Sequence, residues 1–486
     1  MDDGLLKSYF KGNSLVKQHL DSYNKFVEKG LRKIIDGMGQ IPTNIEGFEL
    51  KFGDLRLEKP MIVEADGSRR NILPIEARLR NLTYAAPLFL EIIPIFNGIE
   101  RRTYSEVFIG ELPVMLRSKL CHLDNMTEDE LIEAEEDSID PGGYFIINGS
   151  ERALVSIEDL APNRIMASKE KKGELTVSKV FSTREGFRAR CAIERKKDGT
   201  MKIDFPGAPK NIYLTTILRA LGLSKDKDIL KGLMDERILR NDTLINLEVD
   251  PSNSIEEAIE YMGKRAAPGQ PEEYRNKRVD VLLDNYLLPH LGTESEKRLT
   301  KAYYLIEMAE RATRIGEGKV KPDDKDHYSN KRVKLAGTLM EELFRYAFQF
   351  LIKDIAYQAG RAEARGRRLV VQNLVRPDAL SDRIKYAMAT GNWIAGQTGI
   401  SQLLDRLSYL STASHLRRLI SPLNKKHPHF KARDLHGTQW GKLCPNESPE
   451  GPSCALVKNI ALMCDISTGE ESEDVEKILV EMGVKL

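Results

Sequence analysis

The chain has 486 residues, too many for a single hydrophobic core, and this length predicts about three domains. Hydrophobic residues make up 41% and charged residues 30% of the chain, the composition of a globular protein in water. No apolar run approaches the ~20 residues that a membrane span needs, and the acidic start of the chain lacks the apolar stretch of a secretory signal. The five cysteines form no CxxC motif, which argues against a disulfide framework and favours a reducing cytoplasm.

The net charge of +1 conceals an uneven distribution of charge. Residues 356–442 contain 15 Lys/Arg and 5 Asp/Glu, a net charge of +10, whereas residues 124–140 contain nine acids and no base. A basic stretch of this size is typical of a surface that faces a polyanion, although a solvated basic face has the same composition.

The first part of the chain predicts one helix followed by strands. Residues 13–35 have a polar cap and then apolar residues three and four positions apart, which predicts a packing helix. Residues 46–109 alternate short apolar runs with Gly, Pro and Asp, as hairpins do. Within them, Arg78 and Arg80 stand two residues apart, so we expect both on one face of a strand.

Two local motifs follow. Thr127 and Glu130 have the spacing of a capping box at the start of an acidic helix. Residues 142–155 predict a hairpin with a type I′ turn at Asn148-Gly149. The chain contains no GxGxxG and no GxxxxGK[ST] motif, so a glycine-rich phosphate loop is not indicated.

A second domain is predicted between about residues 165 and 325, with strands first and helices after them. Residues 169–195 are strand-like with a turn at Lys171–Glu174, and residues 214–290 have helical spacing. The segment 321–332 then contains Asp323, Asp324 and Asp326, which could form a metal site. Lys and Arg residues lie among them, however, and favour a structural hub of ion pairs. A helix over 335–360, ended by Gly360, comes next.

In the basic stretch aromatic residues alternate with bases, a composition suited to gripping phosphates while stacking on bases or sugars. Arg406 falls on a helical pattern, and the Arg417-Arg418 pair could make bidentate phosphate contacts. Each aromatic could equally belong to the core; the residues concerned are Tyr386, Trp393, Tyr409, Phe430 and Trp440.

Residues 433–454, RDLHGTQWGKLCPNESPEGPSC, are rich in Gly and Pro and therefore predict a shaped loop. Charged and aromatic side chains on such a loop could hold a polar ligand, and a solvated connector is the equal alternative.

Taken together, several segments resemble the second-largest, β-like subunit of multisubunit DNA-directed RNA polymerase in its archaeal and eukaryotic form. They occur in the family's order between about residues 70 and 464, and as a set they are highly specific; they are ARLRNLTYAAP, LPVMLRSKLCHL, GGYFIINGSERALV, LLPHLG, DDKDHYSNKRVKLAG, ATGNW, SHLRR and RDLHGTQWGKLCPNESPEGPSCALVKN. Because the family's full-length subunit is longer, the chain resembles the N-terminal polypeptide of a naturally split archaeal subunit, with a truncated chain as the alternative.

The resemblance implies an α+β, multidomain fold with a β-rich N-terminal part carrying packed helices, a mixed lobe insertion and a loop-rich fork. The expected domains are a protrusion over 1–165 and 333–395, a lobe over 166–332, a fork over 396–467, and over 468–486 the start of an external domain that a partner chain completes.

The resemblance also implies a binding role. Glu450, in the PEG motif, matches the family's glutamate near the incoming nucleotide and metal, as a supporting and not a catalytic residue. The nucleic-acid-binding set, from the family motifs and the basic pattern, is Arg406, His415, Arg417, Arg418, Lys425, Lys426, Arg433 and His436. Mg²⁺ would be held by another subunit, and no metal or catalytic residue is expected in this chain.

The expected partners are the C-terminal half of the split subunit, the largest polymerase subunits, small assembly subunits, template DNA and nascent RNA, in the cytoplasm and without a membrane. The chain departs from the family at Gln397, where relatives commonly have Arg or Lys, so a hybrid contact there is not expected. Two other functions remain as alternatives: a stand-alone nucleic-acid-binding protein using residues 356–442, and a phosphoryl or nucleotidyl transferase using the aspartates of 321–332.

Overall fold

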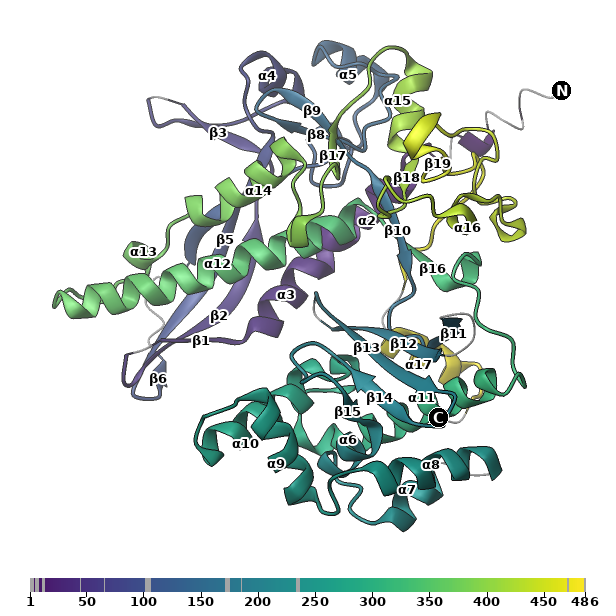
Figure 1. Ribbon diagram of the computed structural model, residues 1–486. Coiled ribbons are helices and arrows are strands. Elements are labelled where there is room, and N and C mark those ends of the chain that lie inside the picture. Colours follow the sequence, from purple (N-terminus) through teal and green to yellow (C-terminus); the bar gives the residue numbers. More distant parts are fainter. Residues whose placement is uncertain are drawn as a thin grey trace. The chain divides into compact units, whose positions relative to one another are not determined.

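The computed structural model describes the chain apart from residues 1–3, 5–7, 11–13, 44, 65, 101–105, 171–174, 185, 233–236, 470–471 and 485–486. The chain divides into two compact units (Figure 1). The first combines Met1–Asp159 with Arg332–Leu486, and the second is Leu160–Lys331. Both contain helices and sheets, which confirms the predicted α+β, multidomain class. Within the described ranges no helix has the length and apolar character that crossing a bilayer requires.

The predicted N-terminal helix is present as three consecutive helical segments. They are α2 (Lys17–Lys25), a π-helical turn (Phe26–Gly30) and α3 (Leu31–Met38). The apolar positions that predicted this helix are buried, among them Tyr23, Leu31 and Ile34. They belong to the largest core of the first unit.

The main sheet of the first unit has the order β1-β2-β5-β6, with β7 also paired to β5. Its strands are β1 (Gln40–Pro42), β2 (Phe48–Leu57), β5 (Ala85–Phe96), β6 (Ile99–Glu100) and β7 (Glu106–Pro113). The paired strands are antiparallel, which confirms the predicted β-rich segment.

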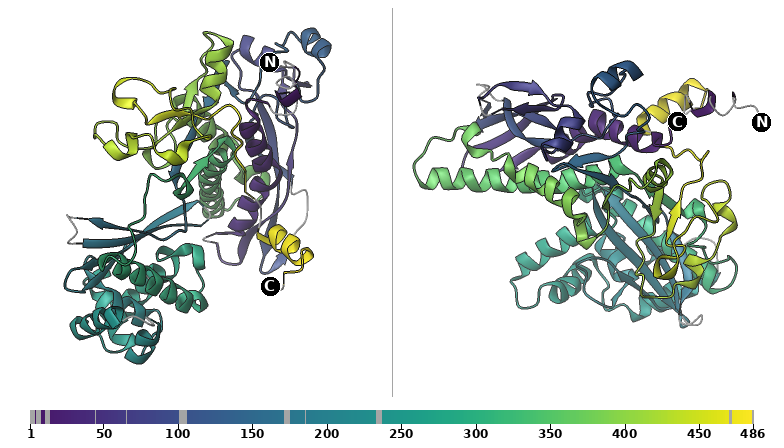
Figure 2. Two further views of the ribbon diagram at one scale, coloured as in Figure 1. Left: turned by 90° about the vertical axis from the view of Figure 1, so that its right-hand side faces the viewer. Right: turned by 90° about the horizontal axis from the view of Figure 1, so that it is seen from above.

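Three further helices complete this core: α12 (Ala336–Ala364), α13 (Val371–Leu374) and α14 (Asp378–Thr390). The long helix α12 runs along α2 and α3 (Figure 1, Figure 2), and a Cβ added at Gly337 would overlap the Ser22 carbonyl oxygen. This close approach explains the glycine at that position. The expectation that Gly360 ends α12 is wrong: the helix continues to Ala364, and Gly366, with φ of 62°, follows its C-cap.

The expected placement of Arg78 and Arg80 on one strand face is also wrong. The hairpin of β3 (Met61–Val63) and β4 (Arg69–Asn71) is followed by a short helix, α4 (Pro74–Leu79). Pro74 occupies its first turn, where a missing N–H costs nothing, so the helix forms in spite of the alternating pattern. Arg78 lies inside this helix and Arg80 is its C-cap.

Both local motifs are confirmed. At the start of α5 (Glu128–Glu133), the Thr127 side chain accepts from the Glu130 N–H, and the Glu130 carboxylate accepts from the Thr127 N–H. Strands β8 (Phe145–Ile147) and β9 (Ser150–Leu154) form the hairpin, and Asn148 and Gly149 both have positive φ, as a type I′ turn requires.

Two small sheets carry the C-terminal part of the first unit. β17 (Ser401–Leu403) extends the hairpin in the order β17-β9-β8. The other has the order β16-β10-β18-β19; its strands are β16 (Lys331–Lys334), β10 (Ser156–Leu160), β18 (Arg418–Ile420) and β19 (Val457–Asn459). Strands far apart in sequence therefore frame the segment that contains SHLRR. The last helix is α17 (Ser472–Glu481).

The second unit has strands first and helices after them, as predicted. Five antiparallel strands lie in sequence order: β11 (Met166–Glu170), β12 (Leu175–Arg184), β13 (Phe187–Lys196), β14 (Met201–Asp204) and β15 (Ile212–Tyr213). The helices are α6 (Leu214–Ala220), α7 (Asp226–Gly232), α8 (Arg237–Val249), α9 (Ile255–Ala266), α10 (Glu272–Val281) and α11 (Arg298–Gly316). The predicted turn at Lys171–Glu174 lies outside the described residues.

The aspartate-rich segment 321–332 is engaged in the packing of this unit. The Asp323 carboxylate accepts from the Arg311 guanidinium, at 2.5 Å for the shorter bond, and from the Ala167 N–H at 2.7 Å. These contacts agree with a structural hub. In the part of the chain that the structure describes, no group of three or more His, Cys, Asp or Glu is placed to hold a metal ion.

Candidate nucleic-acid interface

The segment with most of the predicted site residues begins at helix α15 (Tyr409–Leu416). Ser408 caps this helix: its hydroxyl oxygen accepts from the Ser411 N–H at 3.1 Å, and the Ser411 hydroxyl oxygen accepts from the Ser408 N–H. The cap places Arg406 in the loop before the helix, which corrects the expectation that Arg406 is helical. Figure 1 shows α15, β18, β19 and α16 in one region of the first unit.

The Arg406 guanidinium is held by side chains of this chain. It donates to Glu151 at 2.6 Å, to Asp140 at 2.7 Å and to the Tyr144 hydroxyl at 2.8 Å. Arg78 also donates to Glu151, at 2.9 Å, so two arginines share one carboxylate. This network fixes the loop that precedes α15.

The two adjacent arginines at the end of α15 have different surroundings. Arg417 is 7% exposed, and its guanidinium donates to the carbonyl oxygens of Leu15 and Ala461, both at 2.7 Å. The guanidinium makes two longer bonds, to the carbonyl oxygens of Leu462 at 3.3 Å and Ile460 at 3.4 Å. Burial lowers the pKa of Arg417. Arg418, the first residue of β18, is only half-buried. Arg417 is the C-cap of α15, whereas Arg418 begins the extended strand, in which the next residue, Leu419, is buried. Because side chains alternate along a strand, Arg418 points to the side opposite to Leu419.

His415 is buried and bonded inside the unit. Its Nδ1 accepts from the Asp405 N–H at 3.2 Å, and its Nε2 donates to the Gln402 side-chain oxygen at 3.1 Å. Burial, followed by the positive charge of Arg418, lowers the pKa of His415 to about 4. The imidazole is therefore neutral at pH 7 and offers no positive charge to a phosphate.

A buried ion pair joins the two strands that flank β18 in its sheet. Lys458 of β19 donates to Glu158 of β10 at 2.7 Å, and the Ser421 hydroxyl also donates to Glu158. The side chains of Lys458 and Glu158 are 8% and 4% exposed. Sequence reasoning missed this pair because 300 residues separate its members and neither lies in a recognisable local motif.

The loop after β18 carries the exposed bases. Lys425 and Lys426 are both exposed, and Asn424 accepts from the Lys426 N–H at 3.0 Å. The short helix α16 (Phe430–Arg433) follows. The Arg433 guanidinium donates to the carbonyl oxygens of Pro428, Pro452 and Cys454, at 2.8, 2.9 and 2.7 Å. Arg433 therefore ties this loop to the Gly- and Pro-rich segment.

Residues 433–454 form a shaped loop with short helical turns, as predicted. Glu450 is exposed and is the N-cap of the turn Gly451–Ser453, two residues before a carbonyl that Arg433 holds. The His436 Nδ1 lies 2.6 Å from the Thr438 hydroxyl. Trp440 is 87% exposed, whereas Trp393 is buried, so the core alternative holds for Trp393.

Comparison with known proteins identifies the family. The model of the RNA polymerase beta subunit matches residues 14–382, and that of RNA polymerase Rpb2, domain 3, matches residues 402–466. The chain is 51% identical to the DNA-directed RNA polymerase subunit Rpo2N of Methanococcus vannielii, over 99% of this chain and 98% of that one. The chain belongs to the RNA polymerase beta subunit family.

Other relatives of the chain extend the match. Rpo2N of Methanocaldococcus jannaschii is 51% identical over 99% of both chains. Rpo2 of Saccharolobus solfataricus is 49% identical over 99% of this chain but only 43% of its own length. The resemblance drawn from the motifs is therefore confirmed at the level of the family and of its Rpo2N members.

Eight of the nine predicted site residues fall into two groups. Arg406, Arg417, Arg433 and His415 have their polar groups bonded to other parts of the same unit. Lys425, Lys426 and Glu450 are exposed, and Arg418 is half-buried at the end of α15. The sequence alone does not separate these groups, since Arg417 and Arg418 are adjacent residues of the same type and fall into different groups.

Proposed function

We propose that this chain is the part of a DNA-directed RNA polymerase that binds template DNA and the RNA–DNA hybrid and helps to form the wall of the active centre. The observation that carries the proposal is a division among the basic residues of the first unit. The guanidinium groups of Arg406, Arg417 and Arg433 are hydrogen-bonded inside the unit, whereas Lys425 and Lys426 are exposed. Its relatives are DNA-directed RNA polymerase subunits by name, which supports this interpretation.

In this proposal the phosphate contacts come from Arg418, Lys425 and Lys426. The two lysines are exposed on a loop that Arg433 anchors through three backbone carbonyls. Arg418 precedes the buried Leu419 in the extended strand β18, so its side chain points to the side opposite to Leu419. Contacts from Lys and Arg to phosphates supply affinity without reading sequence, as transcription of any template requires.

The other predicted contacts act as positioning residues. Arg406 and Arg417 hold the two ends of the α15 segment, and His415 is a neutral, buried hydrogen-bonding group within it. Arg433 shapes the loop that carries Lys425 and Lys426, and His436, hydrogen-bonded beside Thr438, lies within the Gly- and Pro-rich loop. Their guanidinium and imidazole groups are already occupied, which supports an indirect role.

Glu450 is proposed to assist near the incoming nucleotide. Its carboxylate is exposed on a turn whose backbone Arg433 stabilises, so it is available to act outside the chain. Phosphoryl transfer depends mainly on positioning and charge screening, to which a single carboxylate can contribute without serving as base or nucleophile. The reaction's Mg²⁺ would be held by another subunit and supply the main charge stabilisation.

The proposed partners are the C-terminal half of the split subunit, the largest polymerase subunits and small assembly subunits, acting in the cytoplasm. The test is reconstitution with and without these chains. We expect the isolated chain to incorporate no nucleotides with Mg²⁺, and the assembled enzyme to do so with this chain present in a one-to-one ratio to the C-terminal half. Incorporation by the isolated chain, or full activity of an assembly that lacks it, would overturn the proposal.

A further inference from the structure

The exposed side of α12 carries bases that lie apart from the predicted interface residues, which begin at Arg406. Four exposed residues of this helix and its C-cap follow one another at intervals of four, so they form one row along the helix surface. Two further exposed arginines follow the C-cap. We call these six residues the α12 row; they are Lys353, Tyr357, Arg361, Arg365, Arg367 and Arg368.

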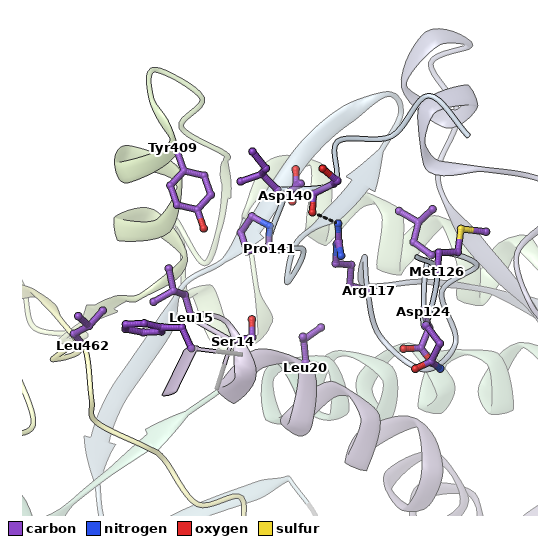
Figure 3. Close-up of a pocket in the computed structure, with 15 residues that line it drawn as sticks. Ser14, Leu15, Leu20, Arg117, Asp124, Met126, Asp140, Pro141, Tyr409 and Leu462 are labelled. Carbon is purple, nitrogen blue, oxygen red and sulfur yellow. Dashed lines mark hydrogen bonds between the residues drawn. The ribbon is translucent and has the colours of Figure 1, made fainter. Parts of the chain in front are cut away.

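The four arginines of the α12 row are not occupied by other parts of the chain. Among the residues that the structure describes, their guanidinium groups form no hydrogen bond and no ion pair. Arg117, in the pocket at the start of α15, differs: its guanidinium donates to the Ser138 carbonyl oxygen at 3.1 Å (Figure 3). Of the two acids in 353–368, Asp354 is bonded to Arg376 at 2.8 Å, which leaves Glu363 against five bases. The row therefore presents a net positive charge to solvent.

The neighbouring helix α14 adds another exposed base at the start of the row. The Arg383 guanidinium lies 3.9 Å from the centre of the Phe350 ring, and the Lys353 ammonium lies 5.6 Å from the same ring centre. The ring attracts both cations and so keeps two like charges together at the surface. The helix dipole favours cations in the last turn of a helix, which accounts for Arg361 and Arg365. It does not account for Lys353, three turns earlier, or for a base on another helix.

The α12 row lies far along the helix from the predicted interface. Helix α12 begins directly after β16, in the sheet that contains β18, and runs away from α15, α16 and β18 (Figure 1, Figure 2). Arg361 comes 25 residues after Ala336, so the helical rise places it about 38 Å from the start of the helix. Duplex DNA rises about 3.4 Å per base pair, so about 11 base pairs cover that length. A nucleic acid held at β18 must extend on the order of ten base pairs to reach the row.

Three features of the α12 row favour the backbone of double-stranded DNA as its ligand. Guanidinium groups bind phosphate oxygens through paired hydrogen bonds, and a row of them suits a backbone of repeated phosphates. Single-stranded nucleic acid is gripped by stacking aromatics, whereas Tyr357 is the one aromatic in 353–368. The centre of a protein interface is depleted of charge, and five of the six residues of this row are charged.

We propose that the α12 row contacts the phosphates of duplex DNA that continues beyond the nucleic acid held at β18. The identity of this DNA as the template of a polymerase rests on the proposed function. Contacts of this kind do not depend on base sequence and weaken as the salt concentration rises. The row would hold the duplex at a second surface of the first unit and so restrict the directions in which it leaves the enzyme.

The test is the affinity of the reconstituted polymerase, containing the full chain, for two templates with the same RNA–DNA hybrid. One template has about five base pairs of duplex on each side of the hybrid and the other about 30, so only the second is long enough to reach the α12 row. The variant is Arg361→Gln with Arg365→Gln, which removes two charges that have no partner in the chain. The matched control is Lys59→Gln with Arg69→Gln, the same loss of charge at two exposed residues elsewhere in the first unit.

On the long template we expect the variant to bind more weakly. Its slope of log K against log salt should become shallower by about 1.8, because each of two lost phosphate contacts contributes about 0.9. On the short template the variant should bind like the unmodified enzyme, and the control should do so on both templates.

An unchanged slope on the long template would overturn the proposed contact, as would an equal change in the control. An equal loss on both templates would place the effect at the hybrid and overturn it too. Loss of another subunit from the variant polymerase would assign the α12 row to an acidic protein instead. Failure of the proposed function is seen separately, as binding of the short template that Arg418→Ala leaves unchanged.

Discussion

Arg417 offers the sharpest test of the division between positioning and contacting residues. Its guanidinium makes two 2.7 Å bonds, to the carbonyl oxygens of Leu15 and Ala461, which come from opposite ends of the chain. A hydrogen bond from a charged donor contributes about 1.5 kcal/mol, so Arg417→Ala removes about 3 kcal/mol. Relief from burying a charge, evident in the lowered pKa of Arg417, returns part of this and leaves a net loss of about 2 kcal/mol.

A loss of that size should raise local opening around Arg417 about thirtyfold. Hydrogen–deuterium exchange of the full chain measures this directly at the Ile460 amide, which donates to the Arg417 carbonyl oxygen at 3.0 Å. Arg418→Ala is the matched control, since it removes the same side chain one position later, at a half-buried site. We expect its exchange pattern to match that of the unmodified chain.

Binding of an RNA–DNA hybrid separates the two residues in the opposite way. If Arg418 contacts a phosphate, Arg418→Ala should reduce the slope of log K against log salt by about 0.9, whereas Arg417→Ala should keep the slope and lower affinity at every salt concentration. Equal exchange in the two variants, or a reduced slope for Arg417→Ala, would refute the assignment of Arg417 as a positioning residue.

Three further outcomes follow from the structure. First, burial lowers the pKa of His19 and of His415 to about 4, so the unfolded imidazoles bind protons more readily than the folded ones. The first unit should therefore lose up to about 3 kcal/mol of stability per histidine as pH falls from 6.5 to 4, measured as a lower midpoint of thermal unfolding, and His19→Gln should make this pH dependence less steep. Second, Lys458→Ala should cost about 3 kcal/mol or more by removing the cation that balances the buried Glu158 carboxylate. Lys458→Met with Glu158→Leu should be closer to neutral in thermal unfolding, and a double variant as unstable as the single one contradicts this. Third, Glu450→Ala should slow single-nucleotide addition by the reconstituted polymerase without changing assembly, and a change in assembly alone would make Glu450 structural.

The sequence was sufficient to predict features that depend on interactions between residues close together in the chain. The spacing of Tyr23, Leu31 and Ile34 predicted the N-terminal helix, and the Thr127–Glu130 pair predicted a cap that the structure contains. Such features depend on residues three or four apart. The same reasoning failed at Arg78, because Pro74 starts a helix where alternation favoured a strand.

The family and the position of the basic stretch follow from the amino-acid sequence, because ordered motifs and charge are properties of the chain. It could not determine which base faces outward. Arg417 and Arg418 are the same residue type side by side, and what separates them is a set of carbonyl oxygens from Leu15, 402 residues away, and from Ala461, 44 residues away. Only the tertiary structure brings these acceptors together. They occupy the Arg417 guanidinium inside the core, whereas Arg418 begins β18 and points to the side opposite to the buried Leu419.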